Sequence, residues 1–529
     1  MRTRIHRRAM FNIALASVLM AGVVSSGQAG AAPDPSVRRV GVAETPAGTP
    51  VEGGEITVLH LTDASTLDPV SGNSGYDHMS LYPLYDRLVN FDPETLEPQP
   101  GLATAWEQPD AETLVLQLQE GVTFHDGTTF DAEAVKYNLE RALTLDTSTV
   151  KADIAMIDTV EATGPLEVTI HMNRPDASLL MILADRPGMM ISPTAAEAEG
   201  DTFGEHPVGT GPFRLAQWLT GDRLVLEKNP DYWQEGKPYL DGMTIRYIGD
   251  SQTVSNALTA GEADVALKFD ASLVDTLNAS GVNIEVYPSL GTTMCYFNFS
   301  RPPFNDPQVR RAVNLAIDRD AINQGLAYGL AQPANEVFPP GYWAADPDLA
   351  DTFATDLDAA RQLMADAGLA DGVDVRGLTY TGTVQTRLME IMQAQLAEVG
   401  VQMSVETMDV GQATSRFFEE LNYDIYCSGW SGRPDPSQTA NSLFAADSFY
   451  NAGDYDSPGM AEALELAGAT LDQDARAEAF SEVIRLSQDD AILLPVLHQP
   501  DITAVGDDIG GFVPNLYGKV DVSFLWLES

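Results

Sequence analysis

Residues 297–322 read FNFSRPPFNDPQVRRAVNLAIDRDAI and contain a complete helix signal. Asp306 is a residue type that caps helix N-termini, and Pro307 suits the first helical position because its missing N–H would be unpaired there. The apolar residues that follow recur every three or four positions, at Val309, Val313, Ala316 and Ile317. The stretch therefore predicts a helix with one buried face.

The same pattern recurs on both sides of this stretch. Asp131 precedes an apolar period of four over residues 131–143, and residues 387–399 place their apolar side chains on one face before Gly400. Residues 401–405 then alternate, as a strand does, and residues 55–59 form a short β-rich run. Such alternation of helices and strands predicts an α/β fold with mixed or parallel sheets.

The N-terminus reads as a targeting segment. A basic start is followed by an apolar stretch over residues 10–24 and small residues at 29–31, which predicts a cleaved signal peptide over residues 1–31. The apolar stretch is shorter than the ~20 residues of a membrane span. Arg7-Arg8 keeps the twin-arginine route open beside the Sec route. Residues 32–54 are rich in Pro, Gly, Ala and Thr and predict a flexible leader. We expect a periplasmic protein.

The chain is long and strongly acidic. Its 529 residues exceed the usual domain size of roughly 150, so at least two cores are expected. The formal net charge of -47 would repel nucleic acid and anionic membrane surfaces. A cationic ligand and a salt-adapted, solvated surface both explain this charge, and the even spread of the acids favours the second explanation.

The two cysteines leave two interpretations open. Cys295 and Cys427 both lie in apolar, strand-like runs of a chain expected in an oxidising compartment. One disulfide or two buried thiols would fit these surroundings.

Catalytic and cofactor motifs are missing from the sequence. The histidines are far apart, and no HExxH or CxxC spacing occurs, so no metal is expected. Residues 429–433, GWSGR, lack the second glycine of a nucleophile elbow, and residues 209–212, GTGP, lack the glycine and lysine of nucleotide-binding loops. We expect no enzyme activity and no cofactor.

Four separated segments carry a family resemblance. The first comprises residues 67–69, 81–107 and 121–142; the others are residues 207–233, 297–322 and 423–438. In this order they resemble the signature stretches of the family 5 extracellular solute-binding proteins of ABC transporters, the group of dipeptide, oligopeptide, glutathione and nickel binders. Turn-forming residues such as Gly209 and Gly211 also have a structural explanation that needs no ligand.

The resemblance implies a two-lobed periplasmic-binding-protein clamshell, class II-like, with an enlarged first lobe and mixed sheets. Lobe I would comprise residues 55–293 plus 498–529, with an inserted subdomain at about 80–205, and lobe II residues 294–497. Hinges are expected near residues 294–297 and 494–498. The implied function is capture of a small solute by hinge closure and its delivery to the ABC permease subunits of the inner membrane. The protein is expected to act as a monomer and to bind no nucleic acid.

Arg433 departs from the pattern of the peptide-binding relatives. They carry, three residues beyond the Trp of a Gly-Trp pair, an Asp that receives the ammonium group of the peptide; here Trp430 is followed at that distance by Arg433. A guanidinium suits a carboxylate or phosphate, so we expect an anionic group on the ligand. The alternative is that Arg433 pairs internally, with Asp435 or with another acid.

The remaining candidate ligand-binding residues come from three segments. Trp430 could form a stacking wall or belong to the core. The others are loop residues, at which ligand contacts often occur: Asn73, Tyr76, His78, Tyr380, Thr381, Ser431 and Asp435. A conventional di- or oligopeptide binder and a ligand-presenting chemosensory protein remain alternative interpretations.

Overall fold

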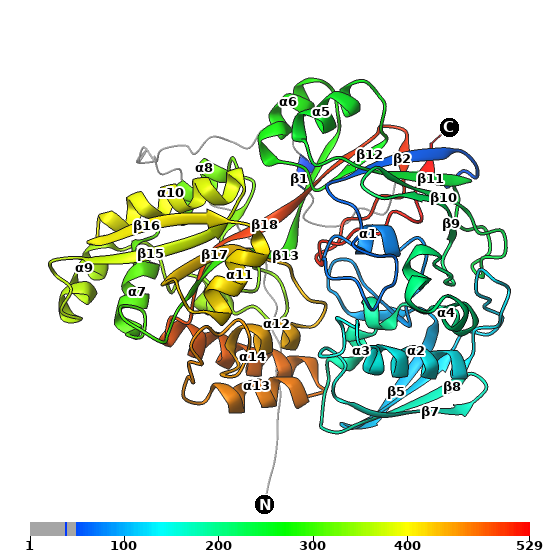
Figure 1. Ribbon diagram of the computed structural model, residues 1–529, viewed down its shortest axis with the longest axis horizontal. Coiled ribbons are helices and arrows are strands. Elements are labelled where there is room, and N and C mark those ends of the chain that lie inside the picture. Colours follow the sequence, from blue (N-terminus) through cyan, green and yellow to red (C-terminus); the bar gives the residue numbers. More distant parts are fainter. Residues whose placement is uncertain (1–37, 40–48, 529) are drawn as a thin grey trace, which may run out of the picture.

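The computed structural model of the protein describes residues 38–39 and 49–528 (Figure 1). The predicted signal peptide and most of the predicted leader lie outside these residues. Within the described part, no helix is both long enough and apolar enough to cross a membrane.

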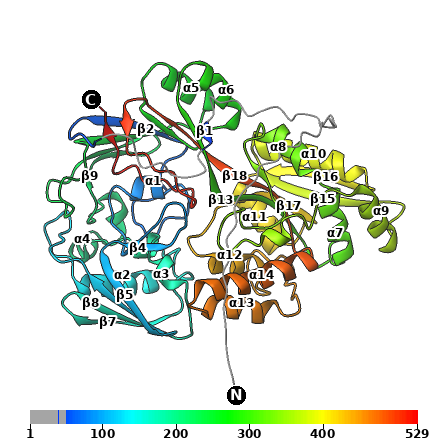
Figure 2. The same ribbon diagram turned by 180° about the vertical axis from the view of Figure 1, so that it is seen from behind.

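One large mixed sheet runs through both halves of the molecule (Figures 1 and 2). Its main path is β16-β15-β17-β13-β18-β12-β2-β11-β10-β9. The long strands β13 (Ile284–Phe297) and β18 (Leu493–Val505) pair antiparallel in its centre and join the two lobes. Because β2 pairs in parallel with both β11 and β12, and β15 with both β16 and β17, the predicted mixed α/β sheet is confirmed.

The first lobe lies on the β2 side of the two central strands. Its strands in the large sheet are β2 (Glu55–His60), β9 (Phe213–Leu219), β10 (Arg223–Lys228), β11 (Gly242–Tyr247) and β12 (Val265–Leu267). Its helices are α1 (His78–Leu81), α4 (Pro193–Glu199), α5 (Ser251–Thr259) and α6 (Val274–Ala279), with 3-10 turns η2 (Gly200–Glu205) and η3 (Ala271–Leu273). Short strands β19 (Ile509–Gly510) and β20 (Trp526–Leu527) pair near the C-terminus.

A separate four-stranded sheet, in the order β5-β6-β8-β7, forms the lower part of this lobe in Figure 1. Its strands are β5 (Ala103–Asp110), β6 (Thr113–Leu118), β7 (Ile157–Gly164) and β8 (Glu167–Met172). Helix α2 (Ala132–Thr144) contacts β7 and β8, and α3 (Leu179–Ile182), η1 (Arg186–Gly188) and the hairpin of β3 (Val89–Phe91) and β4 (Pro98–Pro100) lie nearby.

The second lobe carries the helix-rich part of the chain. Its strands are β14 (Gln332–Pro333), β15 (Val373–Tyr380), β16 (Val401–Met408) and β17 (Ile425–Trp430). Its helices are α7 (Pro307–Ala316), α8 (Arg319–Leu326), α9 (Leu357–Asp366), α10 (Thr383–Ala397), α11 (Val410–Thr414), α12 (Pro436–Phe444), α13 (Met460–Ala469) and α14 (Gln473–Asp489), with short turns η4 (Pro347–Leu349) and η5 (Ser415–Glu419).

The predicted caps explain where these helices begin. The Asp131 carboxylate accepts a hydrogen bond from Ala134 N at 3.0 Å, and that of Asp306 accepts one from Gln308 N at 2.8 Å. One expectation needs correction, because Ile317 does not continue α7. The helix ends at Ala316, and Asp318 caps a second helix, α8, through Ala321 N at 2.9 Å.

Within the predicted leader, the structure describes one element, β1 (Arg38–Arg39), which pairs in parallel with β13 at Glu285 and Val286.

The structure decides between a disulfide and two buried thiols. Cys295 and Cys427 are directly paired residues of β13 and β17 and form a disulfide. This bond joins the central strand to the strand that leads into the Arg433 loop.

Glycines shape the turn into β9. A methyl group at Gly209 would lie 2.2 Å from the carbonyl oxygen of Leu84, and one at Gly211 would lie 2.3 Å from its carbonyl carbon. The backbone approaches too closely for any side chain. The structural explanation of these glycines, packing of a tight turn, therefore accounts for them without a ligand.

Candidate functional site

The loop from Ser431 to Pro434 links the end of β17 to the start of α12 and lies where the two lobes meet. A methyl group at Gly432 would come within 2.1 Å of Cβ of Leu290, so the loop passes tightly over strand β13. Exposed Ser431 faces the first lobe, because a methyl group at Gly75 would lie 3.6 Å from its Oγ. Farther along the same junction, Ala177 N donates to the carbonyl oxygen of Gly468 at 2.8 Å.

Asp435 is engaged within the second lobe. The residue is 1% exposed, and its two carboxylate oxygens accept hydrogen bonds from Nη1 and Nη2 of Arg476 at 3.1 and 2.9 Å. The carboxylate also caps α12 through Ser437 N at 2.9 Å. The suggested internal pair between Arg433 and Asp435 is therefore not formed. Asp435 holds the helix start in place and does not line an open surface.

Arg433 has different surroundings. In the part of the chain that the structure describes, no carboxylate oxygen lies within 4.0 Å of its guanidinium, which sits 5.8 Å from the ring centre of Trp430. Burial acts to lower the pKa of Arg433, but the acids nearby, Asp153 first, outweigh burial and raise it. Asp153 belongs to the first lobe, so this attraction acts across the junction.

Trp430 forms a floor below Arg433. The indole is 7% exposed, its Nε1 donates to Oγ1 of Thr439 at 3.4 Å, and the ring of Tyr450 meets it edge-on at 5.2 Å. These contacts are those of a core tryptophan with one face toward the guanidinium. The structure thus gives Trp430 the contacts of a core residue, and its role as a stacking wall for a ligand stays a prediction.

The loop over residues 71–78 faces this region from the first lobe. It is organised by Asp77, a buried residue that sequence reasoning missed, whose carboxylate accepts hydrogen bonds from Ser65 N at 2.8 Å and Ser74 N at 3.1 Å. The side chain of Asn73 is exposed, and that of Tyr76 is 38% exposed. Both can reach solvent at the junction.

His78 lies deeper than the loop prediction implied. It is 2% exposed, and its Nε2 contacts the carboxylate of Asp185 and lies 3.3 Å from Nζ of Lys519. The hydroxyl of Tyr517 donates to the same carboxylate at 2.8 Å. The structure thus gives His78 a place in a buried charged network and no open face toward a ligand.

Lys519 adds positive charge beneath the junction. It is 3% exposed, and burial lowers its pKa to about 7. Asp185 opposes this shift, whereas nearby cations, Arg433 first, add to it. The other contributing cations are Arg186 and Lys268. Two of the six lysines of an extremely acidic chain, Lys268 and Lys519, therefore contribute positive charge to this region.

Tyr380 and Thr381 follow β15 on the second-lobe side. The hydroxyl of Tyr380 accepts a hydrogen bond from Nε2 of Gln385 at 2.6 Å, and Oγ1 of Thr381 donates to the carbonyl oxygen of Met408 at 3.1 Å. Burial raises the pKa of Tyr380 to about 12, with a contribution from Tyr76 of the opposite lobe.

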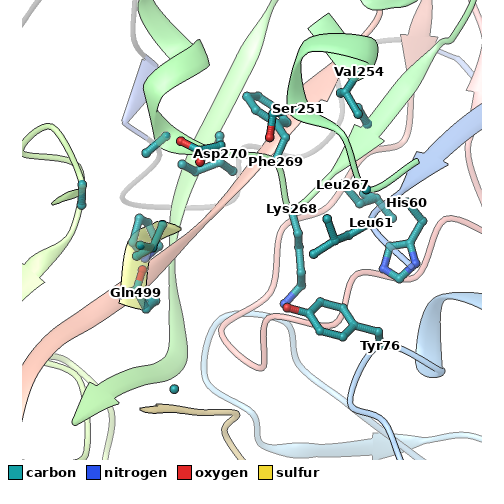
Figure 3. Close-up of a pocket in the computed structure, with 18 of the residues that line it drawn as sticks. His60, Leu61, Tyr76, Ser251, Val254, Leu267, Lys268, Phe269, Asp270 and Gln499 are labelled. Carbon is teal, nitrogen blue, oxygen red and sulfur yellow. The ribbon is translucent and has the colours of Figure 1, made fainter. Parts of the chain in front are cut away.

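A pocket of about 340 Å³ opens beside Tyr76 (Figure 3). Of the nine residues that the sequence nominated, only Tyr76 lines it. Sequence reasoning missed the other lining residues because they come from many separate segments without a shared motif. Examples are His60 at the end of β2, Lys268 after β12, Gln385 in α10 and Gln499 in β18. The positive φ of 54° at Lys268 was not visible in the sequence either.

No group of three or more His, Cys, Asp or Glu side chains in the described residues is arranged to hold a metal ion. The site therefore consists of a cationic loop around Arg433 and a mainly apolar pocket beside it, both at the junction of the lobes. Such an arrangement can hold a solute between the lobes without any group placed for bond cleavage.

Comparison with known proteins finds a matching family model and similar chains. The family model described as "Bacterial extracellular solute-binding proteins, family 5 Middle" matches residues 97–452. The chain is 31% identical over 456 residues to the "Glutathione-binding protein GsiB" of Pectobacterium atrosepticum, covering 82% of this chain and 86% of that protein. It is 29% identical over 496 residues to the protein of the same name from Salmonella paratyphi A, covering 89% and 94%.

Solved structures share the fold. The periplasmic binding protein DppA of Helicobacter pylori, in complex with peptide STSA, aligns with a TM-score of 0.79 at 26% identity and covers 90% of this chain and 99% of that chain. AgaA of A. tumefacien R10, in complex with agropinic acid, aligns with a TM-score of 0.77 at 23% identity, with coverage of 90% and 99%. The two-lobed binding-protein fold is confirmed.

Proposed function

Because the chain belongs to family 5 of the bacterial extracellular solute-binding proteins, and is thus the non-enzymatic binding component of an ABC importer, we propose that its solute carries an anionic group that binds at Arg433. The solute would be peptide-like or another small polar compound. It would lie between the lobes, contact both and favour the closed form through its higher affinity for that form.

The observation that supports an anionic ligand most directly is the contrast between two neighbouring charged residues. Asp435 is fully engaged by Arg476, whereas no carboxylate in the described residues lies within 4.0 Å of the Arg433 guanidinium. A guanidinium at a junction that closes over a ligand binds a carboxylate or phosphate strongly, often through two hydrogen bonds. The positive charge of Lys519 beneath it adds to the attraction.

The relatives support an acidic ligand. The curated relatives are named as glutathione-binding proteins, and glutathione carries carboxylates. AgaA, which shares the fold, holds agropinic acid. DppA of Helicobacter pylori holds a peptide, so a conventional di- or oligopeptide binder is the second candidate, one that would place the charged ends of the peptide differently.

We also propose the partners and the compartment that the family implies. The protein would work in the periplasm as a monomer, after removal of residues 1–31, and would dock in its closed form on the permease subunits of the inner membrane. Hinge motion would occur where the β13–β18 ladder is interrupted, between Pro288 and Thr292. This interruption lies just before the crossover expected at residues 294–297. A chemosensory partner would use the same closed form.

The test is a binding screen with the ligand-free, refolded protein. Thermal shifts would be measured with free dipeptides, opines, organic acids and sugars, and the best ligand would be titrated into the wild type and the Arg433→Ala variant. We expect an anionic ligand, and an affinity loss of more than tenfold in the variant because the charge-assisted hydrogen bonds are removed. Arg485→Ala is the matched control, since Arg485 lies on the exposed surface of α14.

An unchanged affinity in Arg433→Ala would assign Arg433 to a structural role and refute the proposal. Stabilisation by free dipeptides, with no response to acids that lack an ammonium group, would favour the conventional peptide binder.

A further inference from the structure

The pocket beside the Arg433 loop has mainly apolar walls. The side chains that form them come from both lobes and include Leu59, Leu61, Val254, Phe269, Val384 and Leu388. Figure 3 shows Leu61, Val254, Leu267 and Phe269 around it, with Tyr76 and Lys268 at one side. Ser428 and Gly429 also line the pocket, and they directly precede Trp430 and the Arg433 loop. Tyr76, which lines the pocket, directly follows Gly75, and a methyl group at Gly75 would lie 3.6 Å from Oγ of Ser431 in that loop, so the pocket and the cationic loop adjoin each other.

The charged groups of this pocket are already paired within the protein. Nζ of Lys268 lies 3.1 Å from a carboxylate oxygen of Asp501, and the carboxylate of Asp270 accepts a hydrogen bond from Ser272 N at 2.8 Å. Lys268 is the only Lys or Arg among the lining residues. The pocket thus offers no uncompensated cation to a second acidic group.

Three neutral polar side chains of the lining donate hydrogen bonds within the protein. Nε2 of Gln385 donates to the hydroxyl of Tyr380 at 2.6 Å, and Nε2 of Gln499 donates to Oγ1 of Thr293 at 2.7 Å. Nδ1 of His60 donates to the carbonyl oxygen of Thr62 at 2.9 Å, and burial lowers the pKa of His60 to about 4, so the ring is neutral at neutral pH. Nε2 of His60 is buried without a hydrogen-bond partner in the described residues, and the rest of the lining is mainly apolar.

That surface is partly exposed to water. Leu61, Tyr76 and Val384 are 38%, 38% and 41% exposed, and all three line the pocket. Leu61 and Tyr76 belong to the first lobe and Val384 to the second, at the start of α10. Exposed large apolar side chains gathered around a concave site mark a surface that a ligand or partner covers. An occupant that fills the pocket would touch both lobes.

We propose that this pocket receives an apolar group of the transported solute, so that the ligand is amphipathic, with an acidic group at Arg433 and an alkyl or aryl group among Leu61, Tyr76 and Val384. The inference rests on the proposed function, since it extends the same binding site. It narrows the ligand from any anionic polar compound to acids that carry a hydrophobic substituent. Contact of this substituent with side chains of both lobes would contribute to closure.

Four probes separate the two ideas: N-acetylglycine, N-acetylleucine and the corresponding amides, N-acetylglycinamide and N-acetylleucinamide. None has a free ammonium group. Comparison of acid with amide tests the anionic site, and comparison of leucine with glycine tests the apolar pocket. We expect calorimetric titration to show N-acetylleucine binding about ten- to a hundredfold more tightly than N-acetylglycine, as burial of a leucine side chain predicts. The heat capacity change should also be more negative for the leucine compound.

A matched pair of variants locates the effect. Leu61→Asp should weaken binding of N-acetylleucine at least fivefold and leave that of N-acetylglycine within twofold, because only the leucine side chain reaches the pocket. Leu466→Asp makes the same change on the exposed surface of α13, where the side chain is 58% exposed, and should change neither affinity. Both positions are solvent-accessible, so the folded state should tolerate an aspartate.

Equal affinities for N-acetylleucine and N-acetylglycine would overturn the apolar pocket while leaving the anionic site intact. Failure of both leucine compounds to bind would also overturn it. If N-acetylleucinamide binds as tightly as N-acetylleucine, the pocket stands and the anionic site at Arg433 fails.

Discussion

Arg433 and Asp435, at the start of α12, are two residues apart, yet only one of the two charged side chains has a close partner of opposite charge. Asp435 is buried and bound by two nitrogens of Arg476, so its charge is satisfied within one lobe. Arg433 has no such partner in the described residues, and the acid that influences it most, Asp153, lies in the other lobe. A charge that is paired within one lobe stabilises the fold. A charge that lies at the junction of the lobes without a close partner is available to a ligand.

The largest effect should come from breaking the satisfied pair. Asp435→Ala leaves the buried guanidinium of Arg476 without its carboxylate and removes the α12 cap. We expect a loss of about 3–5 kcal/mol in the free energy of unfolding, measured by urea denaturation. Arg433→Ala should lose much less stability, although it loses ligand affinity. A stability loss for Asp435→Ala no greater than that for Arg433→Ala would contradict the comparison.

A smaller effect, graded with pH, should come from Lys519 beneath the loop. Burial lowers the pKa of Lys519 to about 7 in the folded protein, whereas the unfolded chain keeps the ordinary value of 10.5. Between these two pH values the folded protein has released the proton and the unfolded chain still holds it. Stability should therefore rise with pH above 7, by about 1.4 kcal/mol per pH unit from this group. Affinity for an anionic ligand should fall severalfold over the same range, since the positive charge near Arg433 is lost.

Replacement of Lys519 by methionine is the control, because it removes the titrating amine and keeps a long side chain. In Lys519→Met, thermal melts at pH 6 to 9 should show a smaller change of stability with pH. Titrations over the same range should show a smaller change of ligand affinity. An affinity that stays constant with pH in the wild type would show that Lys519 does not act on the ligand.

The smallest effect should come from a charge that is neither buried nor at the junction. Arg485 on α14 contacts Glu482 at 2.6 Å and also Asp489, and all three side chains are well exposed. Water and salt screen such pairs, so Arg485→Ala should leave the free energy of unfolding nearly unchanged, most of all in high salt. A larger loss in chemical denaturation would place this surface network among the structural charges.

Much of the local structure was predictable from short stretches of sequence. The caps at Asp131 and Asp306 and the glycine turn before β9 depend on neighbours within a few residues, and each appears in the structure as expected. The end of α7 was missed because the apolar period continues through Ile317, while the side chain of Asp318 favours a new helix start.

The site was predicted only in part. Arg433 could be singled out because it replaces an acidic residue in a recognisable segment, and the structure places it at the junction of the lobes. Lys268 and Lys519 were missed, since their surroundings are built from segments that are hundreds of residues apart. Asp77 was missed although its partners Ser65 and Ser74 are near it in the sequence. His78 was expected on an open loop, but tertiary packing buries it against Asp185.

By itself the sequence determined the α/β alternation, the helix starts, the family and the inverted charge at Arg433, because each is written in consecutive residues. The tertiary structure decided that Asp435 pairs with Arg476, that Cys295 bonds Cys427, and that an apolar pocket lies beside Arg433. These features depend on which distant side chains meet. Those contacts follow from the packing of two lobes around β13 and β18, and no local stretch of sequence specifies them.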